Sequence, residues 1–87
     1  MDTRARIAWN LRRLRIAKGL TQENLAVDAS VDRSVISDLE RSRHNVSIDL
    51  LDRLASALAE DISVFFVVPS DDDEAAPPLK VGRKART

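Results

Sequence analysis

The apolar residues near the start of the chain recur at helical spacing. Ile7, Leu11 and Leu14 lie at i, i+4 and i+7, so they share one face of a helix that we expect to cover about residues 4–18. Gly19 follows directly, and glycine suits the left-handed backbone with which many helices end. The pattern predicts a first amphipathic helix that stops at Gly19.

Two shorter amphipathic segments follow, and a tight turn at residues 29–31 joins them. Thr21 precedes the first segment and Asp32 the second, and both residue types are strong helix N-caps. The apolar positions are Leu25 and Ala26 in the first segment and Val35, Ile36 and Leu39 in the second. Two short helices joined in this way are typical of a helix-turn-helix, whose second helix enters the major groove of DNA.

A fourth helix follows a polar loop at residues 42–46. Ser47 is its N-cap, and Asp49 in the first turn suits the helix dipole. We expect its buried stripe to consist of Ile48, Leu51, Leu54, Ala55 and Leu58.

The run ISVFFVV at residues 62–68 fits two structures. Ser63 suits the cap of a short fifth helix, whereas phenylalanine, valine and isoleucine also favour a strand. We favour the helix for the first half of the run. In either case the run needs cover from the core or from a second subunit, because an exposed segment of this kind invites aggregation.

Polar residues dominate from Pro69 onward. The acidic run DDDE at residues 71–74 precedes Pro77-Pro78, and the chain then becomes basic. This composition favours a flexible tail at residues 69–87 behind a domain at residues 1–68. We expect the acidic run to be solvated and not to bind Mg²⁺. The basic end of the tail consists of Lys80, Arg83, Lys84 and Arg86.

Length and cysteine content narrow the class of protein. A chain of 87 residues has room for one small domain. Such a domain buries only about 60% of its unfolded surface, so a second subunit would add stability. The chain has no cysteine, which excludes disulfides and thiolate metal sites and suits the cytoplasm. The longest apolar stretch, residues 62–68, is far short of the roughly 18 residues that a membrane span needs.

The net charge is +0, but the charges are unevenly placed. Residues 1–46 hold nine lysines and arginines against six acids, a net +3, whereas residues 47–87 hold five against eight, a net −3. The positive half contains the helix-turn-helix pattern, and a local basic face matters more for binding phosphate than the total charge does. One histidine and the lack of a phosphate-loop glycine pattern argue against an enzyme, a metal site and a cofactor.

The helix-turn-helix segment resembles the phage repressor and Cro type of regulator, often called the XRE family, over about residues 6–66. The matching positions are Thr21-Gln22-Glu23, Leu25-Ala26, Val31, Ser37, Leu39-Glu40-Arg41 and Asn45. The stretch DRSVISDLERSRHNVS at residues 32–47 also resembles restriction-modification controller proteins. The resemblance implies an all-α, five-helix domain of the lambda-repressor type that binds DNA as a two-fold dimer.

Two serines depart from the family pattern. The family often has glycine at the positions of Ser30 and Ser42, because glycine adopts a left-handed backbone at little cost. A serine in that conformation costs roughly 1 kcal/mol. Either these turns differ from those of the family or the fold absorbs the strain.

The start of a recognition helix reaches base edges, so the exposed residues there are candidates for reading DNA. They are Arg33, Ser34, Ser37 and Asp38. The guanidinium group of Arg33 has the geometry to donate to both O6 and N7 of a guanine. The alternatives for Arg33 are a phosphate contact or a solvated side chain. Ser34 and Ser37 could donate to bases or phosphates, and they are equally consistent with ordinary exposed helix positions. For Asp38 a pair with Arg41 or solvation is favoured over acceptance from cytosine N4, and Val35 fits the core as well as a thymine methyl.

Other polar residues are candidates for phosphate contacts. The resemblance implies that Gln22, at the start of the second helix, holds a phosphate together with the helix N-terminus. The further candidates lie in the loop after the recognition helix and are Arg41, Arg43, His44 and Asn45. His44 has no partner at ligand spacing and is a poor metal candidate. The resemblance also implies a partly buried, structural ion pair between Arg15 and Glu40.

Two apolar groups fit either contacts with a partner or a place in the chain's own structure. The predicted dimer interface consists of Leu50, Leu54, Val64, Phe65 and Phe66, with Val67 at its edge, and the alternative is that these residues finish the core. Trp9 and Ile16 lie opposite the apolar face of the first helix. They fit a docking patch for a partner or for Leu79 and Val81 of the tail, although scattered surface apolar residues are common.

These features favour a cytoplasmic, nucleoid-associated homodimer that binds a double-stranded DNA operator and regulates transcription as a repressor or autoregulator. The sequence does not separate a controller, a prophage repressor and an antitoxin. The alternative is a protein-interaction module, such as an antiactivator or antitoxin, with the same fold. Asp38 on the reading face and Trp9 favour that alternative.

Overall fold

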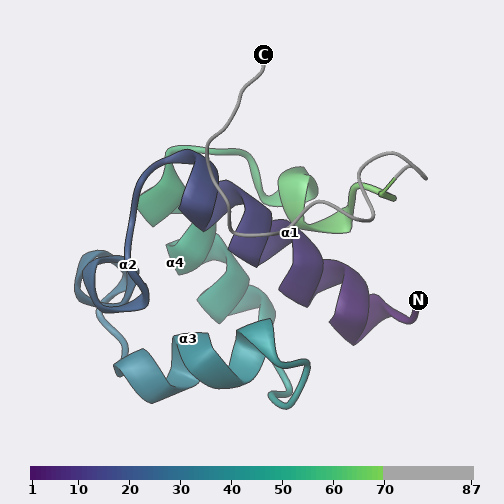
Figure 1. Ribbon diagram of the computed structural model, residues 1–87, viewed down its shortest axis with the longest axis horizontal. Helices are drawn as coiled ribbons and strands as arrows, with labels where there is room; N and C mark the ends of the chain where they lie inside the picture. Colours follow the sequence, from purple (N-terminus) through teal and green to yellow (C-terminus); the bar gives the residue numbers. More distant parts are fainter. Residues whose placement is uncertain (70–87) are drawn as a thin grey trace.

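The computed structural model describes residues 1–69. Within them the chain forms the α-helices α1 (Thr3–Ala17), α2 (Gln22–Ala29), α3 (Arg33–Glu40) and α4 (Ile48–Leu58), followed by the 3₁₀ helix η1 (Ile62–Phe66) (Figure 1). The all-α class is confirmed. The fifth element is a 3₁₀ helix and not an α-helix, and the described residues contain no strand. The predictions for the tail beyond Pro69, including Leu79 and Val81, lie outside the described residues.

Side-chain caps define where most of the helices begin. Thr21 and Ser47 accept hydrogen bonds from the backbone N–H groups of Asn24 and Leu50, which confirms both predicted caps. Asp2 caps α1 in the same way. Asp32 occupies the N-cap position of α3 but makes no side-chain hydrogen bond. The first turn of the predicted recognition helix therefore lacks a side-chain cap.

The cap of η1 is Asp61, so the prediction of Ser63 as the cap is wrong. The Asp61 carboxylate accepts a hydrogen bond from Ser63 N at 2.9 Å. The hydroxyl of Ser63, and after it the backbone N–H, hold the pKa of Asp61 below its ordinary value.

The four α-helices end in the same way, although only one of them uses glycine. A residue with φ near 60–70° follows each helix, and the next N–H bonds to a carbonyl five residues back, as in the Schellman motif. The φ angles are 71° at Gly19, 59° at Ser30, 61° at Ser42 and 58° at Ala59. The two serines therefore keep the left-handed turns, and the fold absorbs the strain. Ala59 does the same without any signal in the sequence.

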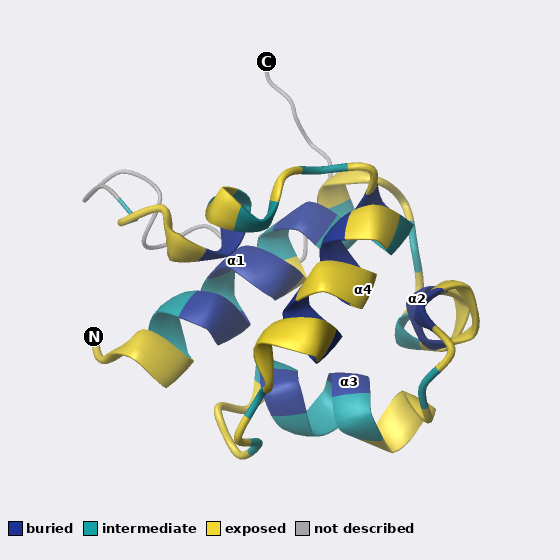
Figure 2. Ribbon diagram, turned by 180° about the vertical axis from the view of Figure 1, so that it is seen from behind, coloured by how far each residue is buried: buried dark blue, intermediate teal, exposed yellow. Residues whose placement is uncertain are grey.

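The core lies between the helices, and buried residues line their inner faces (Figure 2). α1 packs against α3 and η1, while α2 packs against α3 and α4. Ile48 is 73% exposed, so its prediction as a core residue is wrong. It lies directly after the cap of α4, where the helix has not yet turned toward the core. The largest fully buried apolar side chains are Phe65, Leu11, Leu25, Ile36, Leu54 and Leu58.

One fully buried polar side chain, Asn10, fastens η1 to α1. Its Nδ2 lies 3.0 Å from Phe65 O and 2.9 Å from Val67 O, and also 3.0 Å from Arg6 O within its own helix. Its Oδ1 accepts from Arg13 Nη2 at 3.0 Å. Because the amide satisfies carbonyl oxygens that the short η1 leaves free, the chain can turn back along α1 after Phe65.

None of the described helices is long and apolar enough to cross a membrane.

Candidate nucleic-acid interface

A buried ion pair joins α1 to α3 beside the start of α2. Arg15 of α1 donates to Glu40 at the end of α3 through Nε at 2.6 Å and Nη2 at 2.9 Å. The third nitrogen, Nη1, donates to Leu20 O at 2.9 Å. The Arg15 and Glu40 side chains are 13% and 5% exposed, so the predicted structural pair is confirmed. Its two parallel bonds give the strong, geometrically specific form of the interaction.

Gln22 extends this pair toward the predicted recognition helix. Its Nε2 donates to Glu40 Oε1 at 3.1 Å, and its Oε1 accepts from Arg33 Nη1 at 3.2 Å. Both ends of the amide are thus occupied within the chain. We predicted Gln22 as a phosphate ligand, and that role stays a prediction. The contact seen here positions Arg33, which the sequence did not indicate.

The remaining predicted reading residues differ in accessibility. Arg33 and Ser34 are exposed at the start of α3, whereas Ser37 and Asp38 are half-buried one turn later. The predicted side-chain pair between Asp38 and Arg41 is absent from the ion pairs of the described residues. Instead the backbone carbonyl of Asp38 accepts from the N–H groups of Arg41 and Arg43 and so closes the helix.

Val35 is half-buried and packs against the core, which favours its structural reading over contact with a thymine methyl.

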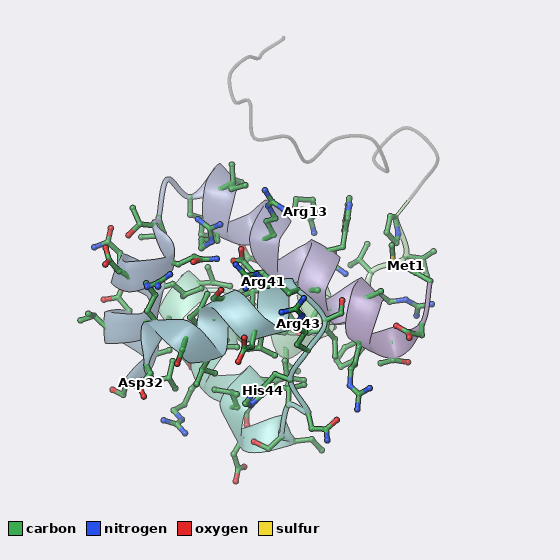
Figure 3. All side chains as sticks on the ribbon, turned by 60° about the horizontal axis from the view of Figure 1, so that its bottom comes forward. Met1, Arg13, Asp32, Arg41, Arg43 and His44 are labelled. Atoms are coloured by element: carbon green, nitrogen blue, oxygen red, sulfur yellow. The ribbon has the colours of Figure 1, made fainter. Side chains whose placement is uncertain are left out.

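The loop that follows α3 carries the predicted phosphate ligands. Arg41, Arg43 and Asn45 are exposed, and His44 is half-buried. Figure 3 shows Arg41, Arg43 and His44 together on this loop, beside α3. Asn45 Oδ1 accepts a hydrogen bond from Arg4 Nη2, so the loop is tied to the start of α1. Among residues 1–69, no group of three or more histidines, cysteines and acids is arranged to hold a metal ion.

The predicted dimer residues divide between the core and the surface. Leu54 and Phe65 are 0% exposed within a single chain, so they cannot contact a partner and their prediction as interface residues is wrong. Leu50 is 7% exposed and also belongs to the core. Their apolar spacing fits a core as well as an interface. Val64 is half-buried, while Phe66, Val67 and Val68 are 41%, 48% and 66% exposed.

Trp9 and Ile16 are half-buried, which fits neither an open docking patch nor two freely exposed surface residues, the two interpretations that the sequence left open. The Arg13 guanidinium lies 5.2 Å from the centroid of the Trp9 ring, the geometry of a cation–π contact, and covers one face of it. Sequence reasoning missed this contact and the role of Asn10. The signal for Asn10 was available, because it is a polar residue three positions after Ile7 and beside Leu11 on the apolar face.

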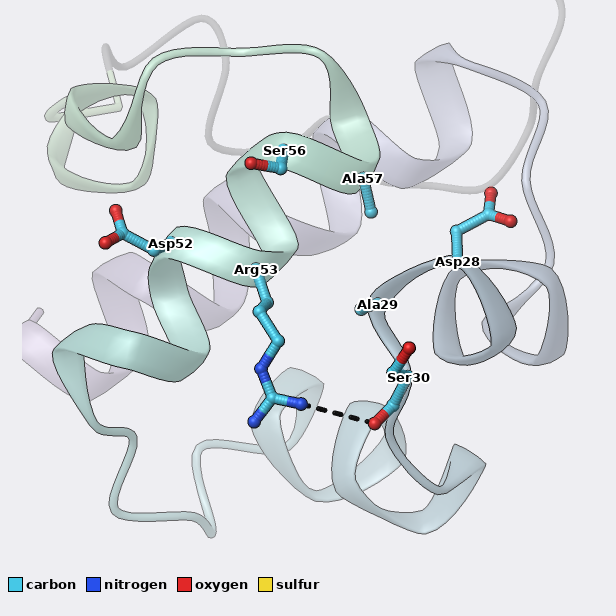
Figure 4. A pocket seen from close by; sticks show the side chains of 7 residues that line it. All are labelled: Asp28, Ala29, Ser30, Asp52, Arg53, Ser56 and Ala57. Carbon is cyan, nitrogen blue, oxygen red and sulfur yellow. Dashed lines mark hydrogen bonds between the residues drawn. The ribbon is translucent and has the colours of Figure 1, made fainter.

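A hollow of about 330 Å³ separates the end of α2 from α4 (Figure 4). Arg53 of α4 reaches across it and donates to Ser30 O at 3.3 Å, which supports the strained turn between α2 and α3. Asp28 and Asp52 lie on opposite sides of the hollow, one on each helix.

Two short helices, joined by a tight turn and buried against α1 and α4, with an exposed arginine at the start of the second, define a helix-turn-helix domain. The helix-turn-helix family HTH_3 matches residues 11–65. The chain belongs to this family, and the resemblance to XRE-type regulators and controller proteins is confirmed.

Two proteins of similar sequence are named as a transcription factor and a transcriptional regulator. A Neisseria hypothetical transcription factor from Neisseria meningitidis serogroup B is 40% identical over 57 residues, which are 66% of this chain and 54% of that protein. The chain thus spans about half the length of this relative. The uncharacterized HTH-type transcriptional regulator y4dJ of Sinorhizobium fredii is 39% identical over 72 residues, which are 83% of this chain and 92% of that protein.

A solved structure supports the fold. The restriction-modification controller protein C.AhdI from Aeromonas hydrophila superposes with a TM-score of 0.71 at 40% identity, over 72% of this chain and 96% of that one.

Proposed function

We propose that the protein is a sequence-specific, homodimeric transcriptional regulator that binds a two-fold operator in double-stranded DNA and acts as a repressor or autoregulator. The start of α3 enters the major groove, while the start of α2 and the loop at residues 41–45 contact phosphates. Bound at a promoter, the dimer blocks access of polymerase. Its cytoplasmic, nucleoid-associated location stays a prediction.

The position of Arg33 carries this proposal. It is exposed in the first turn of α3, and Gln22 holds one of its terminal nitrogens at 3.2 Å. An arginine fixed in this way keeps its other donors free for a guanine, and a bidentate contact of this kind discriminates by about 1–3 kcal/mol. The loss of side-chain freedom on binding is also smaller for an arginine that is already positioned.

The dimer would form through the exposed apolar residues at the end of the described chain. Phe66, Val67 and Val68 are consecutive and exposed, Val64 beside them is half-buried, and none of the described α-helices covers Phe66 to Val68. An apolar cluster of this kind on a small domain marks an interaction surface. Two copies would supply two half-sites, which helix-turn-helix dimers read about one helical turn apart.

The dimer is tested by sedimentation of a Phe66→Ser, Val68→Ser variant. We expect the unchanged protein to be a dimer at tens of micromolar and the variant to be a monomer. Val27→Ser is the matched control, because Val27 is 76% exposed on α2 and lies outside the proposed interface. A monomeric unchanged protein, with and without DNA, would contradict the dimer.

DNA recognition is tested by selecting binding sites from random duplex DNA with the full-length protein. We expect a two-fold symmetric motif with a guanine in each half-site. Arg33→Ala should lose the preference for that guanine, whereas Arg12→Ala, which removes the same charge from the exposed surface of α1, should keep it. If a folded sample selects no motif at modest salt, the protein-interaction alternative replaces this proposal.

A further inference from the structure

α1 and its C-cap are strongly basic, and four of the six cations there have no anionic partner in the described chain. Six cations and no acid lie between residues 4 and 18: Arg4, Arg6, Arg12, Arg13, Arg15 and Lys18. Within residues 1–69, Arg15 pairs with Glu40 and Lys18 with Glu60, and Arg4 donates to Asn45. Arg4, whose partner is a neutral amide, and Arg6, Arg12 and Arg13 make no ion pair there.

Three buried nitrogen donors on this helix also lack an acceptor among residues 1–69. They are Arg6 Nε, Trp9 Nε1 and Arg13 Nε. Their positions at i, i+3 and i+7 place them along one side of α1, which we call the α1 donor face. Buried donors without a partner are uncommon in folded proteins, because each has lost its hydrogen bond to water. Three along one side of a helix indicate that an acceptor group belongs there.

The end of the described chain leads back to the α1 donor face. Asn10 lies between Trp9 and Arg13 in sequence, and its amide binds the carbonyl oxygens of Phe65 and Val67. The segment at residues 65–67 therefore runs directly beside this face. Figure 1 shows η1 packed against α1, and Figure 3 shows Arg13 projecting from α1.

The next charged residues along the chain are acids. Asp71, Asp72, Asp73 and Glu74 begin four residues after Val67. Four residues of extended chain reach about 13–14 Å, whereas one helical turn of about 5.4 Å separates Asn10 from Arg6 on one side and Arg13 on the other. The acidic run can therefore reach all three donors, and its short tether keeps its local concentration high.

We propose that the acidic run Asp71–Glu74 docks on the α1 donor face of its own chain. Its carboxylates accept hydrogen bonds from the guanidinium groups of Arg6 and Arg13 and from the Trp9 indole N–H. Four consecutive carboxylates match a face with several cationic donors and no acid of its own. This contact lies apart from α3 and does not depend on DNA binding.

Trp9 reports on this contact directly, because it is the one tryptophan in the chain and gives a single indole N–H resonance in an ¹H–¹⁵N spectrum. The acidic run is neutralised with D71N, D72N, D73N and E74Q in the full-length protein. At low salt we expect this variant to shift the Trp9 resonance away from its position in the unchanged protein. Raising the salt to about 1 M should move the unchanged protein to the same new position, because the Debye length falls to about 3 Å.

The matched control neutralises the other charged cluster of the tail, with K80Q, R83Q, K84Q and R86Q. It changes the same number of charges, and the Trp9 resonance should stay in place. If neutralising the acidic run leaves the resonance where it was, the proposal is wrong. If the shift is present but disappears on dilution, the acidic run of a second copy occupies the face and the assignment to the same chain is wrong.

Discussion

Arg33 at the start of α3 and the loop at residues 41–45 after its end are held in different ways, although both are predicted to contact DNA. At the first end, Arg33 is linked through Gln22 and Glu40 to Arg15, in a series of side-chain contacts of 2.6–3.2 Å. At the other end, backbone bonds to Asp38 O close the helix, and the Asn45 side chain meets Arg4. Arg33 is thus connected to the buried ion pair that Glu40, the last residue of α3, makes with α1, whereas the loop that follows Glu40 is connected to the surface. A site that reads bases needs a fixed geometry, whereas a loop that contacts phosphates gains little from one.

The largest expected effect comes from breaking the side-chain contacts that hold Arg33 at their buried acid, Glu40. Glu40→Gln leaves the Arg15 guanidinium without its anion at 13% exposure, and removing one partner of a buried pair costs about 3 kcal/mol or more. Urea unfolding measures this change in the free energy of unfolding. The matched control is Glu60→Gln, because Glu60 pairs with Lys18 at the surface, where such pairs contribute less than about 1 kcal/mol. Equal effects at Glu40 and Glu60 would show that the buried pair holds α3 no more strongly than a surface pair would.

A comparison of Arg33→Ala with Arg43→Ala tests the two roles directly. Arg33→Ala should weaken binding to the selected operator by about 1–3 kcal/mol and relax the preference at one base pair of each half-site. Arg43→Ala should weaken binding to all sequences alike and reduce the salt dependence of the affinity by about one unit of slope. Titrations of both variants at several salt concentrations separate these outcomes. Uniform weakening by Arg33→Ala would make it a phosphate ligand.

Gln22→Ala should have a smaller effect that depends on Arg33. Without the amide, Arg33 keeps its charge but loses its positioning contact, so we expect a loss of about 1 kcal/mol on the operator and little change on other sequences. The Gln22→Ala, Arg33→Ala double variant should be less impaired than the sum of the single variants, because the two residues act together. If the two effects add, Gln22 contacts DNA independently and does not act through Arg33.

The sequence predicted the features of this site that depend on spacing. The caps Thr21 and Ser47 follow from residue type and position, and the resemblance supplied the pair of Arg15 with Glu40. The contacts of Gln22 with Arg33 and of Asn10 with Phe65 join residues that are 11 and 55 positions apart. Such contacts depend on how the helices pack, and periodicity within one segment carries no information about them.

The predicted dimer interface and η1 also depend on packing that periodicity within one segment does not describe. Leu54 and Phe65 have apolar neighbours at the spacing of an interface, but the fold places them at the centre of the core. The run at residues 62–68 has the composition of a strand, yet the Asp61 cap and the amide of Asn10 stabilise a 3₁₀ turn followed by an extended exit. In both cases a contact from another part of the chain overrides the local preference.

The smallest expected effect improves the loosely held loop that follows α3. Ser42 has a φ of 61°, a conformation that costs a non-glycine residue roughly 1–2 kcal/mol. Glycine avoids this cost, but it loses more conformational entropy on folding, which offsets part of the gain. We therefore expect Ser42→Gly to stabilise the domain by about 0.5–1 kcal/mol in urea unfolding. Because Ser42 lies beyond the side-chain contacts that hold Arg33, base preference in the selection experiment should not change. A stabilised variant with altered base preference would show that the two ends of α3 are coupled, and the contrast between them would then be wrong.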